Sequence, residues 1–303
     1  MSTIPNFVLN NGMKIPALGC NYQASFVGTY KMRKCEVIDE SIKCAVKSGY
    51  RLIDSAIGYK NEDSIGKAIR ELIDDPSLGL KREDFFISTK LPPNDQGYDC
   101  CLKAFSCSLK RWKFDYLDLF LIHWPGSHRL KPSDPKHAEN RKGSWKALEK
   151  LYAEGKVRSI GISNYTHLHL TELLSYCTVV PQVLQFELHP LLYQKDIIEL
   201  CKKHNIKVQA YSSLGEGKLV NGEIDLPILK EIADKNGVTP AQVLLRWGYQ
   251  HDAIVIPKSI TPERISQNAN IFHFELTEQD MESLDSLSET QRSRFCWDPT
   301  NIC

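Results

Sequence analysis

The chain has 303 residues, of which 42% are hydrophobic and 25% are charged. This composition supports a large buried core and excludes the disordered, collagen-like and low-complexity classes. Lys and Arg number 38 against 37 Asp and Glu, so the formal net charge is +1. No global field therefore draws the protein toward nucleic acid or an anionic membrane, and a small molecule is the expected partner.

Neither a targeting segment nor a membrane span is apparent. The opening MSTIPNFVLNNG lacks the basic start and apolar run of a secretory signal. No window approaches the roughly 18 uncharged apolar residues of a membrane-spanning helix. The 10 cysteines contain no C-x-x-C pair. We therefore expect a cytoplasmic protein with reduced thiols and no membrane contact.

Short apolar runs, rich in β-branched residues, recur eight times along the chain. Each is mostly apolar on both faces, which is typical of a parallel strand covered by helices. In chain order the runs are ALGC (17–20), RLIDSA (51–56), FFISTKL (85–91), LDLFLIHW (117–124), RSIGISN (158–164), VLQFELH (183–189), KVQAYSSL (207–214) and AIVIPKS (253–259).

Between these runs, apolar residues repeat with the period of about 3.6 residues that is typical of amphipathic helices. The clearest stripes are Ile38, Ile42, Ala45 and Val46; Leu102, Phe105, Leu109 and Trp112; and Trp145, Leu148, Leu151 and Tyr152. The later segments 196–205, 226–237 and 239–250 complete the alternation. The pattern predicts an α/β fold, a single (β/α)₈ TIM barrel over residues 1–303.

Two local signals refine this fold. Asn11 and Gly12 lie between apolar flanks, which predicts an N-terminal β-hairpin ahead of the barrel that closes its lower end. A doubly wound sheet is the competing architecture, but the G-x-G-x-x-G and G-x-x-x-x-G-K-[ST] motifs of nucleotide-binding sheets are absent from the sequence. Their absence counts against a Rossmann domain and leaves nucleotide binding open.

In a TIM barrel, the functional groups lie at the carboxyl ends of the strands. Asp54, Lys90 and His123 stand at three such ends, and Tyr59 follows in a loop. Taken singly, a polar residue at the end of a strand more often has a structural role. Together these residues suggest a catalytic site, because a buried ammonium is tolerated beside a carboxylate. A lysine near Tyr59 is expected to lower the pKa of the phenol by about 1 to 3 units and so make it an acid near neutral pH.

These residues belong to a longer ordered series of motifs. The series comprises Asp54, Tyr59, Asn61 and Glu62 in D-x-A-x-x-Y-x-N-E, Lys90 in FISTKL, His123 in DLFLIHWP, Ser163 and Asn164 in GISNY, Gln185 and Glu187 in QFELHP, Tyr211 in AYSSLG, and Lys258, Ser259, Arg264 and Asn268 in IPKSITPERISQN. Through them the whole chain resembles the aldo-keto reductase family, in its short-loop form.

The resemblance implies a barrel that binds NADPH/NADP+ without a Rossmann fold. It implies that Tyr59 is the general acid, that Lys90 lowers its pKa, and that Asp54 holds Lys90. His123 would orient the substrate carbonyl, beside Trp124 as a pocket wall. The cofactor-binding residues implied are Ser163, Asn164, Gln185, Tyr211, Ser212, Leu214, Lys258, Ser259, Arg264, Gln267 and Asn268, with Lys258 and Arg264 on the 2′-phosphate.

Several departures from the family pattern bear on the substrate. Gln267 stands where the family has an acidic residue against adenine, so the charge there is lost. The span from Gly126 to Gly143 is short for the family and so is the tail, which predicts a compact, open pocket, with Trp297 as a further wall. The H-x-H pair of His167 and His169 lacks a carboxylate partner, and we expect no metal site.

The leading hypothesis is a monomeric NADPH-dependent carbonyl reductase that acts on aldehydes, 2-oxoaldehydes and some ketones. A second hypothesis is a regulatory module that holds NADP(H) with negligible turnover. The complete set of Asp54, Tyr59, Lys90 and His123 argues for the enzyme. A third hypothesis, a metal-assisted barrel hydrolase, fails because the sequence offers no set of metal ligands.

Overall fold

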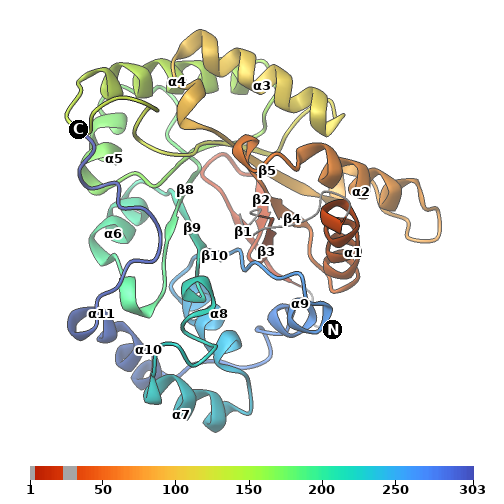
Figure 1. Ribbon diagram of the computed structural model, residues 1–303, viewed down its shortest axis with the longest axis vertical. Coiled ribbons are helices and arrows are strands. Elements are labelled where there is room, and N and C mark those ends of the chain that lie inside the picture. The colour runs from red at the N-terminus through yellow and green to blue at the C-terminus, as the bar shows by residue number, and fades with distance from the viewer. Residues whose placement is uncertain (1–3, 23–32) are drawn as a thin grey trace.

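Eight parallel strands form the centre of the fold (Figure 1). The computed structural model describes residues 4–22 and 33–303. The strands are β3 (Gly19–Asn21), β4 (Leu52–Asp54), β5 (Phe86–Leu91), β6 (Leu119–Ile122), β7 (Ile160–Ser163), β8 (Val183–Glu187), β9 (Lys207–Tyr211) and β10 (Ile254–Val255). Each lies in or overlaps one of the eight predicted runs, so the strand prediction is confirmed.

The sheet closes on itself. Neighbouring strands pair in sequence order from β3 to β10, all in parallel. A parallel bridge between Leu18 and Val255 joins the two edges, and the Val255 N–H donates to the Ala17 carbonyl at 3.0 Å. The predicted (β/α)₈ barrel is therefore confirmed, and its closure leaves no exposed sheet edge.

Helices surround the barrel (Figure 1), and the residues of the predicted apolar stripes are buried or half-buried in the core between helices and strands. They are α1 (Arg33–Lys47), α2 (Glu62–Asp74), α3 (Tyr98–Trp112), α4 (Lys136–Ala153), α5 (His167–Leu174), α6 (Lys195–Lys203), α7 (Pro227–Asn236), α8 (Pro240–Gln250), α9 (Pro262–Ala269), α10 (Glu278–Asp285) and α11 (Leu287–Thr290). Trp112 and Trp145 are completely buried between this layer and the strands. Within the residues described, no helix is both long and apolar enough to cross a bilayer.

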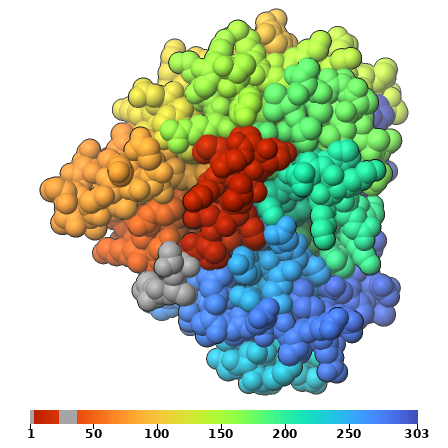
Figure 2. All heavy atoms as spheres, turned by 180° about the vertical axis from the view of Figure 1, so that it is seen from behind, coloured from red at the N-terminus to blue at the C-terminus, as the bar shows by residue number. Residues whose placement is uncertain are grey.

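The N-terminal hairpin covers one end of the barrel. Strands β1 (Asn6–Val8) and β2 (Lys14–Pro16) pair antiparallel, and Gly12 in their connection has a φ of +82° that favours glycine. Leu9 and Ile15 pack with the inward-facing residues of the strands. Seen from behind in Figure 2, the hairpin lies across the middle of this face. The predicted hairpin is confirmed, and the opposite end of the barrel is left for the site.

Candidate active site

A buried ion pair lies at the centre of the candidate site. Asp54 ends β4 and Lys90 lies in β5, and both side chains are completely buried. The Lys90 Nζ lies 2.6 Å from Asp54 Oδ2 and donates to the Ser55 carbonyl at 2.7 Å. Burial alone would lower the pKa of Lys90, but the Asp54 carboxylate and the nearby Tyr59 raise the net pKa above its ordinary value. The ammonium is therefore charged.

Three further side chains fix the Asp54 carboxylate. Asn21 donates to Oδ2 at 2.9 Å, while Ser88 and Gln185 donate to Oδ1 at 2.9 and 3.1 Å. Asp54 thus accepts hydrogen bonds from β3, β5 and β8 at once. Sequence reasoning missed Asn21 and Ser88 here. Ser88 lies two residues before Lys90 and so shares its inward face, a signal that was available.

Tyr59 and His123 lie against this pair. Tyr59 ends the 3₁₀ turn Ile57–Tyr59, and its ring centroid lies 5.1 Å from Lys90 Nζ. The rings of Tyr59 and His123 meet edge to face, with their centroids 5.6 Å apart. The structure therefore brings together all four residues expected to be catalytic.

Lys90 acts in the predicted direction on Tyr59, but the predicted net lowering of the Tyr59 pKa is wrong. Burial raises the pKa of the phenol, and the lowering effect of the Lys90 ammonium is smaller, so the net pKa lies above its ordinary value. Tyr59 consequently holds its proton throughout the neutral range. Lys90 still opposes the rise, and it stands where it can stabilise a tyrosinate once the proton has left.

His123 is a neutral imidazole. Burial and the Lys90 ammonium lower its pKa to about 3. Its backbone N–H donates to the Leu91 carbonyl at 3.0 Å, which fixes the end of β6 against β5. A neutral imidazole carries one N–H donor, so His123 can orient a carbonyl oxygen by a hydrogen bond.

A second polar cluster adjoins the first. Asn164, with a φ of +63°, donates to the His123 carbonyl at 2.9 Å and to Ser163 Oγ at 3.1 Å. The Tyr211 hydroxyl donates to Asn164 Oδ1 at 2.6 Å. Gln185, already bonded to Asp54, also donates to Gln209 Oε1 at 2.7 Å. Amide, hydroxyl and aromatic groups thus converge beside His123, a donor set that suits an aromatic carboxamide.

The other expected cofactor residues lie farther along the chain, after β9 and β10. Ser212, at a φ of +48°, and Leu214 are half-buried in the loop after β9. Lys258 and Arg264 are exposed, as two cations recruited by a phosphate would be. Ser259 accepts the Thr261 N–H at 3.1 Å, just before α9. Asn268 is buried, and Gln267 lines a cavity of about 460 Å³ with Thr239 and Asn270.

The last residue of the D-x-A-x-x-Y-x-N-E motif has a structural role. Glu62 begins α2 and is buried. Its carboxylate accepts hydrogen bonds from Thr89, Ser108, Arg111 and Trp112. It therefore ties α2 to β5 and α3, which fixes the loop that carries Tyr59.

In the H-x-H pair, the side chain of His169 has a structural role. His169 Nε2 lies 2.9 Å from the Ile302 carbonyl, and its Nδ1 contacts Thr166. In the described residues, no group of three His, Cys, Asp or Glu side chains could hold a metal ion. His169 instead attaches the C-terminal residues to α5.

This histidine gives a testable pH dependence. Burial lowers the pKa of His169 to about 4, so the folded protein holds it neutral while the unfolded chain takes up a proton below about pH 6.5. Stability should therefore fall as the pH drops from 6.5 toward 4. The test is to measure the unfolding free energy by urea titration at pH 6.5 and at pH 4, in the wild type and in His169→Gln. The loss between the two pH values should be smaller in His169→Gln by about 2 to 3 kcal/mol. Equal losses in the two proteins would contradict this role.

Two tryptophans meet beside the end of β6. Trp124 follows His123, and its ring meets Trp297 edge to face with the centroids 6.1 Å apart. Trp297 is 81% exposed. The segment that carries it runs after α11 past α6 and α5 (Figure 1).

Comparison with known proteins places this geometry in a family. The model of the aldo/keto reductase family matches residues 26–289. The chain belongs to the aldo/keto reductase family. The resemblance inferred from the motifs is thereby confirmed, and the protein is an oxidoreductase. Its relatives include the glyoxal reductase of Bacillus subtilis, 43% identical over 94% of this chain and 93% of that protein.

Two other members of the family extend the comparison. The 9,11-endoperoxide prostaglandin H2 reductase of Trypanosoma cruzi is 40% identical over 97% of this chain and 94% of its own. The structure of an aldo-keto reductase of Bombyx mori, solved in complex with NADP, matches this chain with a TM-score of 0.87. The two chains are 28% identical, and the match covers 98% of this chain and 96% of the other.

Proposed function

We propose that this aldo-keto reductase is an NADPH-dependent carbonyl reductase that converts aldehydes, 2-oxoaldehydes and some ketones to alcohols. The observation that carries the proposal is the completely buried Asp54–Lys90 pair beside Tyr59 and His123. A buried ammonium next to a protonated phenol is suited to a reaction in which the phenol gives up its proton.

The residues present fit a nicotinamide cofactor. Ser163, Asn164 and Gln185 offer the hydroxyl and amide groups that a carboxamide requires, and Tyr211 offers an aromatic face beside them. Lys258 and Arg264 would hold the 2′-phosphate that distinguishes NADPH from NADH, and Gln267 and Asn268 lie near them on α9. When bound, the cofactor supplies the hydride.

The side chains of this protein supply the proton and the orientation. His123, which is neutral, donates a hydrogen bond to the substrate carbonyl oxygen. Tyr59 gives its proton to that oxygen as the carbonyl carbon accepts the hydride, so the product is an alcohol. The Lys90 ammonium stabilises the tyrosinate that remains, and Asp54 holds Lys90 in place.

We propose compact carbonyl compounds as the preferred substrates. The Bacillus subtilis relative is named for glyoxal, and the short span from Gly126 to Gly143 leaves little chain to enclose a large ligand. We further propose a monomeric, cytoplasmic enzyme. All nine cysteines whose side chains the structure describes are free thiols, which suits a reducing compartment.

The test is NADPH oxidation with a panel of carbonyls. We expect a higher kcat/KM for glyoxal, methylglyoxal and small aldehydes than for steroid ketones, because aldehydes accept hydride more readily and the short span from Gly126 to Gly143 predicts a compact pocket. A steroid reduced more efficiently than every small aldehyde would overturn the substrate proposal. Tight NADPH binding without turnover of any carbonyl would instead support the regulatory alternative.

A further inference from the structure

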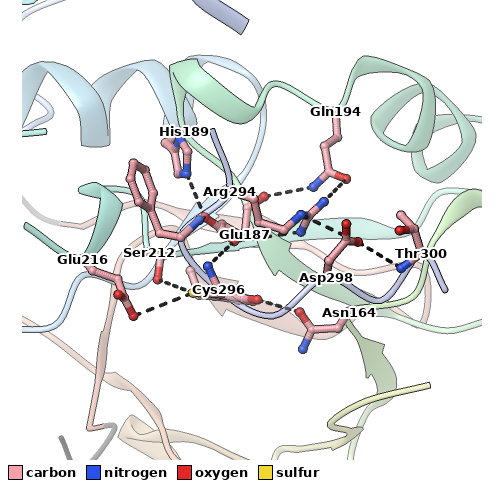
Figure 3. A network of polar contacts seen from close by, with 12 residues as sticks. Asn164, Glu187, His189, Gln194, Ser212, Glu216, Arg294, Cys296, Asp298 and Thr300 are labelled. Atoms are coloured by element: carbon pink, nitrogen blue, oxygen red, sulfur yellow. Dashed lines mark hydrogen bonds and ion pairs between the residues drawn. The ribbon is translucent and has the colours of Figure 1, made fainter. Parts of the chain in front are cut away.

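Strand β8 presents a second carboxyl-end residue above Gln185. Glu187 lies two residues after Gln185 and so shares its inward face, one step nearer the mouth of the barrel. Its side chain is completely buried. Yet it contacts no group of the proposed proton-transfer set. Its two oxygens accept backbone N–H groups, Oε1 from Phe295 at 2.7 Å and Oε2 from Cys296 at 3.0 Å (Figure 3).

The neighbours of Glu187 keep its carboxylate ionised and fix its orientation. His189 Nε2 lies 3.0 Å from Oε1, and Arg294 Nη1 lies 3.9 Å from Oε2. Burial opposes ionisation, but the bonds from His189 and from the two backbone N–H groups prevail, so the net pKa of Glu187 lies below its ordinary value. Gln194 donates to the Glu187 carbonyl and accepts from Arg294, which closes the network in Figure 3.

Phe295 and Cys296 also pack against the loop after β9. Gly215 has a φ of +57°, and a Cβ there would lie 2.8 Å from the Phe295 ring. Glycine at this position therefore makes room for Phe295. Cys296 Sγ lies 3.4 Å from Ser212 Oγ and 3.9 Å from Glu216 Oε1 (Figure 3).

Phe295 and Cys296 belong to residues 293–303, which we call the C-terminal strap. The other end of this strap is fixed by separate contacts. Buried Arg141 donates to the Cys303 carbonyl at 2.7 Å, and the Cys303 N–H donates to the Pro132 carbonyl at 3.0 Å. His169 contacts the Ile302 carbonyl. The strap is thus held at both ends, and Trp297, directly after Cys296, lies between them against Trp124.

We propose that Glu187 is a positioning residue for substrate selection: by fixing the backbone of Phe295 and Cys296 it places Trp297 as the aromatic wall opposite Trp124. A carboxylate suits this task because it accepts two N–H groups at once, and charge-assisted bonds are the stronger ones. The proposal rests on the proposed carbonyl reductase function. Proton transfer itself stays with Tyr59 and Lys90.

Glu187→Gln tests the clamp, because the amide has nearly the same shape but only one acceptor oxygen. Backbone hydrogen exchange of Phe295 and Cys296 should accelerate at least tenfold, a readout that needs no activity. With NADPH saturating, the kcat/KM ratio of phenylglyoxal to methylglyoxal should fall about fivefold, chiefly through KM, because the aromatic substrate reaches the wall and the small one does not.

Two further variants separate the possible causes. Asp298→Asn removes a charge from the same strap at a side chain that is 51% exposed and bonds only within the strap, so it should change neither readout by more than about twofold. Trp297→Ala should reproduce the change in the ratio without accelerating exchange at Phe295 and Cys296. It also tests the wall should Glu187→Gln fail to fold.

Each outcome decides a separate point. Unchanged exchange in Glu187→Gln would overturn the clamp. Faster exchange with an unchanged substrate ratio would overturn its role in selection, as would an unchanged ratio in Trp297→Ala. If the wild type reduces no carbonyl, the proposed function fails, while the exchange measurement still reports on the clamp.

Discussion

Tyr59→Phe is expected to lower kcat for carbonyl reduction by about 10²-fold or more, because general acid catalysis is commonly worth about 10²- to 10⁴-fold. The phenol lies against the charged Lys90 and the neutral His123, and its raised pKa keeps the proton available at neutral pH. Phenylalanine preserves the ring and its packing and removes only the hydroxyl group that carries the proton. Single-turnover measurements of NADPH oxidation with methylglyoxal give the rate directly.

The control for this variant is another buried tyrosine. Tyr50 donates its hydroxyl to the Ile265 carbonyl at 3.2 Å, outside the site, so Tyr50→Phe should keep the wild-type rate. The Kd for NADPH, measured by fluorescence, should be nearly unchanged in both variants. A Tyr59→Phe protein that keeps most of its rate would show that the proton comes from another group.

NADPH is expected to bind at least tenfold more tightly than NADH. Lys258 and Arg264 are exposed cations on either side of the start of α9, where a 2′-phosphate would engage both. Hydrogen bonds to charged groups contribute about 1.5 to 3 kcal/mol each, and solvent screening reduces that figure at exposed side chains. NADH lacks the phosphate, so these bonds are lost. Fluorescence titration with each cofactor measures the ratio.

The Arg264→Ala variant tests the role of the Arg264 cation. It should reduce the preference for NADPH over NADH, mainly by weakening NADPH binding. Lys202→Ala removes an exposed cation from α6 and should leave both Kd values unchanged. The effect of Arg264→Ala should shrink at high salt, because charge-assisted contacts at an exposed surface are screened. Equal Kd values for NADPH and NADH in the wild type would contradict the assignment of the phosphate to Lys258 and Arg264.

Much of this protein was predictable from the sequence because the relevant signals are local. Strand and helix periods depend on neighbours within a few residues, so the eight strands and the three apolar stripes could be identified without the fold. The turn at Asn11 and Gly12 predicts the hairpin for the same reason. The positions of Asp54, Tyr59, Lys90 and His123 follow once strand ends are known, because a barrel gathers its strand ends around one axis.

The tertiary structure decided the features that depend on distance in space. The direction of the Tyr59 pKa shift is the balance of burial against the field of Lys90, and no sequence pattern gives the size of either. The four side chains that donate to Asp54 include Gln185, 131 positions away, and Glu187 meets Cys296 across 109 positions. Such contacts exist only because the tertiary fold brings distant segments together, and a hydrogen bond requires its two atoms to lie within about 3 Å of each other.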